Sequence, residues 1–168
     1  MKKTLILLLA VALLTAGCLV TGNIVIQIDV GDFSLSPDET FGYEMVNLND
    51  NPDYVEHKDD LNSIDDIGFV CKVHNTGGTT ATGKLYISNT SQTSAVPNDK
   101  ILVLDGISVA AGQTKTITLE ESYNYLKNFE AARDAILKEQ FTVYWTASGQ
   151  FTLDVTDMVI VLSINGKP

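Results

Sequence analysis

Oxygen-bearing side chains occupy alternate positions of one polar stretch, as they do in calcium-binding loops. These side chains are Asn47, Asn49, Asn51 and Asp53, and calcium prefers several oxygen ligands from carboxylates and amides. An EF-hand loop counted from Asn47 would need glycine at its sixth position and glutamate at its twelfth, where this chain has proline and lysine. A solvated acidic loop is therefore the favoured interpretation, and binding of a divalent cation or small ligand by region 47–66 is the alternative.

Side chains that could act as nucleophiles, bases or zinc ligands are few. Cys71 falls on the apolar face of an alternating segment, where a thiol is more often packing than nucleophile. His57 and His74 have no cysteine or carboxylate at zinc-ligand spacing. The adjacent acids Glu120 and Glu121 suit a helix start, where the helix dipole favours them. We therefore predict no catalytic residue, no cofactor and a protein that is not an enzyme.

The first residues have the pattern of a signal for export. Lys2 and Lys3 precede an unbroken apolar run, Leu5–Leu14. The run is shorter than the ~20 residues that a membrane-spanning helix needs, which is typical of a signal peptide. The chain is therefore expected in the cell envelope.

The segment Leu14-Thr15-Ala16-Gly17-Cys18 resembles the lipobox of bacterial lipoproteins. It departs from the commonest form at Thr15, where leucine is usual. The resemblance implies that residues 1–17 are cleaved and that Cys18 carries acyl chains such as palmitate, of which two or more anchor a protein stably. Leu19 differs from the aspartate of an inner-membrane retention signal, which favours the outer membrane in a Gram-negative cell. An ordinary secretory signal, with Cys18 unmodified, is the alternative.

The composition is that of a folded and acidic protein. Hydrophobic residues make up 45% of the chain and charged residues 19%, which is typical of a globular domain. The formal net charge is −10, so few cations could neutralise phosphates, and nucleic acid is excluded as a partner. The same charge should be repelled by anionic lipids, so membrane contact must come from the anchor. With Cys18 lipidated, Cys71 would have no disulfide partner.

Alternating hydrophobic and polar residues predict several strands with one buried face. The predicted strands are Asn23–Val30, Ile67–His74, Thr82–Ser88, Ile101–Leu104, Ile107–Val109, Thr114–Leu119, Phe141–Thr146 and a final strand from Phe151. The polar stretch from Ser36 to Pro52 is predicted to be loop, with at most a short strand around Phe41–Leu48. Gly31-Asp32 is expected to end the first of them. The turn Asn75–Gly78 predicts a hairpin between the strands on either side of it, and Ser148-Gly149 predicts another.

The final strand changes parity along its length. Its apolar residues are first odd-numbered and then even-numbered: Phe151, Leu153, Val155, then Met158, Ile160, Leu162 and Ile164. A slip of one residue near Thr156-Asp157 predicts a β-bulge or a crossing between two sheets.

Two segments have helical spacing instead. A short amphipathic surface helix is predicted near Asp53–Ile64. A longer helix is predicted over Glu120–Gln140, with acids early, as the helix dipole prefers, and one apolar stripe. The stripe consists of Leu126, Phe129, Ala132, Ile136 and Leu137.

These elements together predict an antiparallel β-sandwich with one inserted amphipathic helix and one short surface helix. Segment 69–119 is similar to immunoglobulin-like modules of bacterial envelope proteins, in its Val73-His74-Asn75-Thr76-Gly77 turn and its Val109–Thr114 approach to a strand. We expect a cleaved signal at 1–17, a lipidated tether at 18–22 and a single domain at 23–168. The expected role is a non-enzymatic, membrane-anchored module that binds or scaffolds envelope proteins.

Overall fold

The computed structural model describes residues 23–36, 38, 41–148 and 152–166. The expected signal peptide 1–17 and the expected tether 18–22, including Cys18, lie outside the described residues. Within the described residues, no helix is long and apolar enough to cross a membrane.

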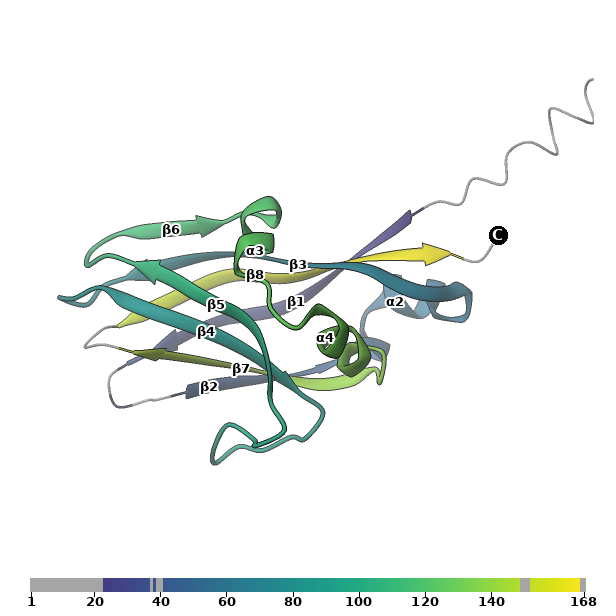
Figure 1. The fold of residues 1–168 in the computed structure, drawn as a ribbon, viewed down its shortest axis with the longest axis horizontal. Coiled ribbons are helices and arrows are strands. Elements are labelled where there is room, and N and C mark those ends of the chain that lie inside the picture. Colours follow the sequence, from purple (N-terminus) through teal and green to yellow (C-terminus); the bar gives the residue numbers. More distant parts are fainter. Residues whose placement is uncertain (1–22, 37, 39–40, 149–151, 167–168) are drawn as a thin grey trace, which may run out of the picture.

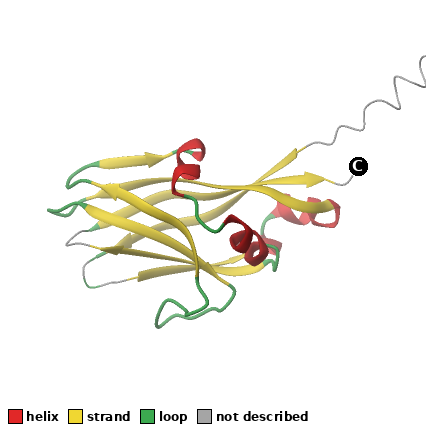
Figure 2. Cartoon of the chain, in the orientation of Figure 1, coloured by secondary structure: helices red, strands yellow, loops and turns green. Residues whose placement is uncertain are grey.

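Two four-stranded antiparallel sheets pack face to face (Figures 1 and 2). Sheet A has the order β1 (Asn23–Leu35), β8 (Leu153–Gly166), β3 (Leu61–Asn75) and β6 (Thr114–Ile117). Sheet B has the order β2 (Phe41–Asn47), β7 (Gln140–Ser148), β4 (Ala81–Ser88) and β5 (Ile101–Val109). The predicted mainly β sandwich is confirmed.

The core lies between the sheets and is built from the alternating apolar residues that the sequence pattern identifies. Ile26 and Ile28 of β1, Phe69 of β3 and Val143 of β7 are all buried there. Apolar side chains from both inner faces interdigitate in such a sandwich, and their removal from water is the main stabilising contribution.

The predicted parity slip in the last strand is a β-bulge. Val155 before the slip and Met158 after it are both buried, so both parities face the core in turn. Asp157 between them has a positive φ of 54°. The register with β1 shifts at the same place, between Asp29 and Phe33. The strand therefore stays in sheet A while its inward face changes from odd to even positions.

The two predicted hairpins are wrong, because each turn carries the chain from one sheet to the other. β3 and β8 lie in sheet A, whereas β4 and β7 lie in sheet B. Asn75 is buried where the chain leaves β3, and its amide donates to the carbonyl oxygens of Thr79 (2.8 Å) and Val109 (2.9 Å). Asn75 therefore makes a hydrogen bond to a distant strand at the end of the sandwich. The residue preferences of local turns do not predict such a contact.

The predicted strand end at Gly31-Asp32 is also wrong. Gly31 has a φ of 83°, and its N–H donates to the Asp29 carboxylate (2.8 Å), so β1 passes through a bulge and continues to Leu35. Glycine tolerates this left-handed conformation at no steric cost. Similarly, the two short strands predicted at 101–104 and 107–109 are one strand, β5, with Gly106 at a φ of 86°.

The long helix predicted over Glu120–Gln140 is two helices, α3 (Leu119–Tyr125) and α4 (Phe129–Ile136). The three residues between them pair with the edge of β5. Lys127 N–H donates to Val103 O (2.8 Å), and the Asn128 amide donates to Leu102 O (3.0 Å). At residues 126–128, hydrogen bonds to the edge of β5 replace the backbone hydrogen bonds of a continuous helix.

The predicted apolar stripe of that helix is buried only in part. Ala132 and Ile136 are fully buried, Leu126 and Phe129 are partly buried against the core, and Leu137 is 44% exposed. Leu126 lies before α4, where it bridges Leu104 of β5, and Leu137 lies just past the end of α4, so the five members do not share one helix face.

The helix predicted near Asp53–Ile64 is shorter than expected. A 3₁₀ turn, η1 (Leu48–Asp50), precedes α2 (Pro52–His57), and a second one, η2 (Lys58–Asp60), follows it. β3 begins at Leu61, and Ile64 is buried as a strand residue.

Helix α3 covers the part of β3 that β6 leaves unpaired. β6 pairs only with Cys71–His74, and beyond it the Phe69 N–H donates to the Ser122 hydroxyl of α3 (3.1 Å). Gly68 permits the approach, because a Cβ there would lie 2.0 Å from Cδ1 of Leu119. The helix therefore substitutes for a longer neighbouring strand.

Candidate functional site

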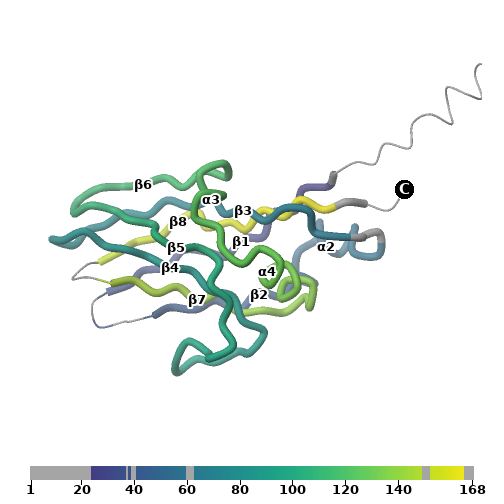
Figure 3. The backbone as a smooth tube through the Cα atoms, viewed as in Figure 1, coloured from purple at the N-terminus to yellow at the C-terminus, as the bar shows by residue number. Residues whose placement is uncertain are grey.

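The two ends of the described chain lie together, beside α2. Asn23, the first residue of β1, pairs with Asn165 near the end of β8, and Figure 3 shows both ends on the α2 side. We call this the proximal end. The distal end is the opposite one, where β1 and β3 finish at Leu35 and Asn75.

Two of the three alternating asparagines at the proximal end, Asn47 and Asn51, are helix caps. The Asn47 side-chain oxygen accepts from Asn49 N–H (3.2 Å) at the start of η1. The Asn51 side-chain oxygen accepts from Tyr54 N–H (2.9 Å) at the start of α2. The Asn51 amide also donates to Gln27 O on β1 (2.7 Å), which ties this segment to the edge of sheet A.

A lysine and a glutamate complete the cluster. Lys58 Nζ donates to the Asn49 side-chain oxygen (3.0 Å), and the Asn49 amide donates to Glu139 (3.1 Å), just before β7. Tyr54 donates its hydroxyl to the same carboxylate (3.3 Å). The hydrogen bond from Asn49, together with the Lys58 charge, lowers the pKa of Glu139, whereas burial and the nearby carboxylate raise the pKa of Tyr54.

These contacts favour a structural role over cation binding for the four candidate metal residues. The oxygens of Asn47, Asn49 and Asn51 all accept hydrogen bonds, one of them from an ammonium group. Asp53 is exposed in the first turn of α2, where an acid suits the helix dipole. A calcium ion would have to displace both caps and Lys58.

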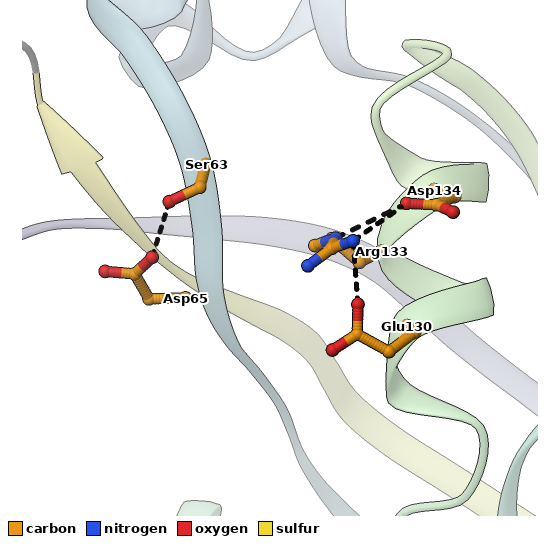
Figure 4. Close-up of polar contacts among 5 residues, drawn as sticks. All are labelled: Ser63, Asp65, Glu130, Arg133 and Asp134. Carbon is orange, nitrogen blue, oxygen red and sulfur yellow. Dashed lines mark hydrogen bonds and ion pairs between the residues drawn. The ribbon is translucent and has the colours of Figure 1, made fainter.

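Two further acids of region 47–66, Asp65 and Asp66, lie on β3 and not in the segment that holds the four candidates. Asp65 lies on β3 and accepts from the Ser63 hydroxyl, near the α4 ion pairs of Arg133 with Glu130 and Asp134 (Figure 4). Asp66 is hydrogen-bonded to Tyr123 of α3 and raises the pKa of that tyrosine to about 12. Among the described residues, no group of three or more acids, histidines or cysteines is arranged to hold a metal ion.

The candidate nucleophile and bases are separate from one another. Cys71 lies in the core, where burial raises its thiol pKa to about 11. It lines an apolar cavity of about 50 Å³ at the distal end, together with Phe33 and Trp145, whose rings stack at 3.5 Å. His74 shares a 2.7 Å hydrogen bond with the Thr114 hydroxyl, and His57 ends α2. Cys71, His74 and His57 therefore lie in separate places and do not form a catalytic group.

The tyrosines of sheet B form a row that sequence reasoning did not identify. Tyr43 of β2 and Tyr86 of β4 lie directly opposite Tyr144 of β7, on the outer face of the sheet. Tyr144 is buried under the loop after β4, where its hydroxyl accepts from Gln92 N–H (2.8 Å). Tyr43 remains 37% exposed. Only the strand register shows that these tyrosines are neighbours, and the register cannot be derived from a single sequence.

Exposed apolar side chains continue along β2. Met45 is 61% exposed, and Phe41 is partly exposed with its ring 6.5 Å from that of Tyr43. Phe41, Tyr43 and Met45 occupy three successive outward positions of a strand at the edge of sheet B. We call these three residues the β2 strip.

No family model and no curated protein matches this chain. Solved structures resemble it only weakly. A structure of infectious bursal disease virus, Gx strain, is 12% identical, with 86% of this chain and 32% of that chain covered and a TM-score of 0.44. Dimeric latent PorU from Porphyromonas gingivalis is 8% identical, with 86% and 13% covered and a TM-score of 0.40.

A xylan-binding module is 12% identical, with 88% of this chain and all of that module covered and a TM-score of 0.37. The chain spans about a third of the length of the virus protein. Matches at this level assign no function to the chain, because unrelated proteins share sandwich architectures.

Proposed function

We propose that this chain is a cell-envelope lipoprotein, anchored through Cys18, that acts as a non-enzymatic binding or scaffolding module for other envelope proteins. The observation that supports the proposal is the position of β1. This strand begins at Asn23, so only Leu19–Gly22 separate it from the lipobox cysteine. Four extended residues span at most about 14 Å, which holds the sandwich close to the bilayer.

The orientation that follows has the proximal end at the membrane. The sandwich extends lengthwise from that end, and the 13 residues of β1 span about 43 Å at ~3.3 Å per residue. Exposed acids at the proximal end, including Asp50, Asp53 and Glu56, would be repelled by anionic lipids. The domain would therefore stand on its tether, with its long sides facing neighbouring proteins of the same membrane.

Fatty-acid labelling of cells that express the full chain tests the anchor. The wild-type chain should incorporate the label and fractionate with membranes, and Cys18→Ser should lose both properties. Cys71→Ser is the matched control and should keep the label, because Cys71 lies in the core. Persistent label on Cys18→Ser would refute the lipoprotein assignment.

Fluorescence quenching tests the orientation. Val25→Cys places a probe site on an exposed position near the start of β1, and Gly78→Cys places one in an open distal turn where an added Cβ meets no neighbour. Quenchers in the lipid headgroups should quench the first probe and spare the second. Equal quenching would contradict the upright orientation, and absence of quenching at both would contradict the short tether.

A further inference from the structure

The four sheet edges of the sandwich differ in how they are protected against pairing with another strand. An exposed edge presents unpaired N–H and C=O groups, and proteins usually shield it with short strands, bulges, charges or covering segments. β6 has only four residues, and β5 is covered by Lys127 and Asn128. β1 carries bulges near Gly31, and Asn51 donates to its Gln27 carbonyl.

β2 is less protected than the other three edges within the described residues, although the Ser91 hydroxyl of the loop after β4 donates to the Met45 sulfur (3.2 Å). Its seven residues pair with β7 without any register shift, and its sequence contains neither lysine nor proline. Its outward positions carry the β2 strip, in which Met45 is 61% exposed, Tyr43 is 37% exposed and Phe41 is partly exposed. Glu44 is the single charged side chain of the strand.

The hydrogen-bonding direction of β2 follows from its ladder with β7. Leu48 N–H donates to Glu139 O (2.8 Å), and this pair continues the β2–β7 register. Because directions alternate along an antiparallel strand, even-numbered residues of β2 face β7 and odd-numbered ones face away. The backbone groups of Phe41, Tyr43 and Met45 therefore point to the free edge, with no hydrogen-bond partner in the described part of the chain.

We propose that a second copy of this chain pairs with that edge, β2 against β2 in antiparallel orientation, to give a two-fold dimer with a continuous eight-stranded sheet. The pairing is centred on Tyr43. It places Phe41 of each copy opposite Met45 of the other, where aromatic and thioether groups attract one another. Each of these pairs joins odd-numbered residues, whose N–H and C=O groups already face outward.

Charge selects this register over the alternative centred on Glu44. Centring on Glu44 would set the two carboxylates directly opposite each other, which is destabilising. Centring on Tyr43 places each Glu44 opposite Gly42 of the second copy, which carries no charge. The strand is thus self-complementary in hydrogen bonding and charge, as a two-fold interface requires. This dimer does not depend on lipidation.

Disulfide trapping in membranes of expressing cells tests the register. Directly opposed residues of a hydrogen-bonded antiparallel pair have Cα atoms about 5.5 Å apart, within disulfide range. Tyr43→Cys should therefore give a disulfide-linked dimer on mild oxidation. Phe41→Cys alone should not, but a mixture of Phe41→Cys and Met45→Cys chains should. Ser108→Cys, at an exposed position of β5, is the control for random collision.

Sedimentation of the detergent-solubilised full chain provides a second measurement. Wild type should sediment as a dimer, and Tyr43→Asp should weaken association by about tenfold or more, because it places two carboxylates at the axis. Circular dichroism of this exposed variant should show an unchanged fold. A monomeric wild type, or trapping of Tyr43→Cys no stronger than that of Ser108→Cys, would overturn the proposal. So would trapping of Tyr43→Cys on a different protein.

Discussion

The sheet edges are covered on one long side of this sandwich and mostly exposed on the other. On one side, which we call the covered flank, α3, residues 126–128 and α4 close the space beside β5 and β6. On the other, the open flank, β1 and β2 lie at the surface, and the Asn47–Lys58 segment covers part of β1. The covered flank adds to the core, whereas the open flank keeps one strand available.

The difference shows that edge protection is distributed within one domain and is not uniform. Ser122 and Asn128 satisfy backbone groups that would otherwise be unpaired beside β3 and β5. Unsatisfied buried groups of this kind cost about 1–3 kcal/mol each, so the covered flank contributes to folding. The β2 strip provides no such hydrogen bond, and we expect substitution of its most exposed member, Met45, to cost little stability.

The largest expected effect concerns the core contact of the covered flank. Ile136 of α4 is fully buried, so Ile136→Ala should lower the free energy of unfolding by about 2–5 kcal/mol. Leu137→Ala changes the next residue, which is 44% exposed, and should cost less than about 0.5 kcal/mol. Urea denaturation of the two variants measures the contrast. Similar midpoints would show that α4 is not packed on the sheets.

The second effect concerns the hydrogen bond that seals β3. Ser122→Ala leaves the buried Phe69 N–H without its acceptor and should cost about 1–3 kcal/mol. The Phe69 amide should also exchange with solvent faster than in the wild type. Ser108→Ala, at an exposed position on β5, is the control and should be neutral. If Ser122→Ala were equally neutral, α3 would cover the edge without supporting it.

Periodicity predicted most of the strands and the bulge near Asp157, because alternation records which face of a strand is buried. It could not predict which sheet each strand joins. The turns after β3 and β7 contain ordinary hairpin residues, yet both cross the sandwich. That choice depends on contacts such as Asn75 to Val109, which join residues distant in the sequence.

The helical region shows the same limit. Thr118 and Glu121 form a capping box that marks the start of α3, a signal readable from the sequence. The break at Leu126–Asn128 is not readable, because these residues are held by the edge of β5. Likewise, the alternation of Asn47, Asn49 and Asn51 resembled ligand spacing. Asparagine before Pro52 was the readable sign of a helix cap.

A smaller effect on the open flank is a dependence of stability on pH. The pKa of Glu139 is lowered below its ordinary 4.5 by the hydrogen bond from Asn49, with Lys58 and Tyr54 contributing. Its stabilising contribution is therefore present above the unfolded-state pKa and is lost as pH falls below about 4.5. Glu139→Gln should reduce the stability at neutral pH and flatten this acid limb. Urea midpoints from about pH 6 to pH 3 measure it, and an unchanged slope would contradict the role of Glu139.

The smallest effect is expected from calcium, and it tests whether the Asn47–Lys58 segment is a cover for β1 or a ligand site. A site filled at a hundred times its Kd would stabilise the fold by about 2.7 kcal/mol and raise Tm by several degrees. We expect millimolar calcium to leave Tm unchanged, because the asparagine oxygens are engaged as caps and with Lys58. Lys58→Ala removes the competing ammonium and is the variant most favourable to a cation. A calcium-dependent rise in Tm in the wild type, abolished by Asn51→Ala, would establish the segment as a binding site. The edge of β1 at Gln27 would then depend on the cation, because Asn51 also donates to that carbonyl.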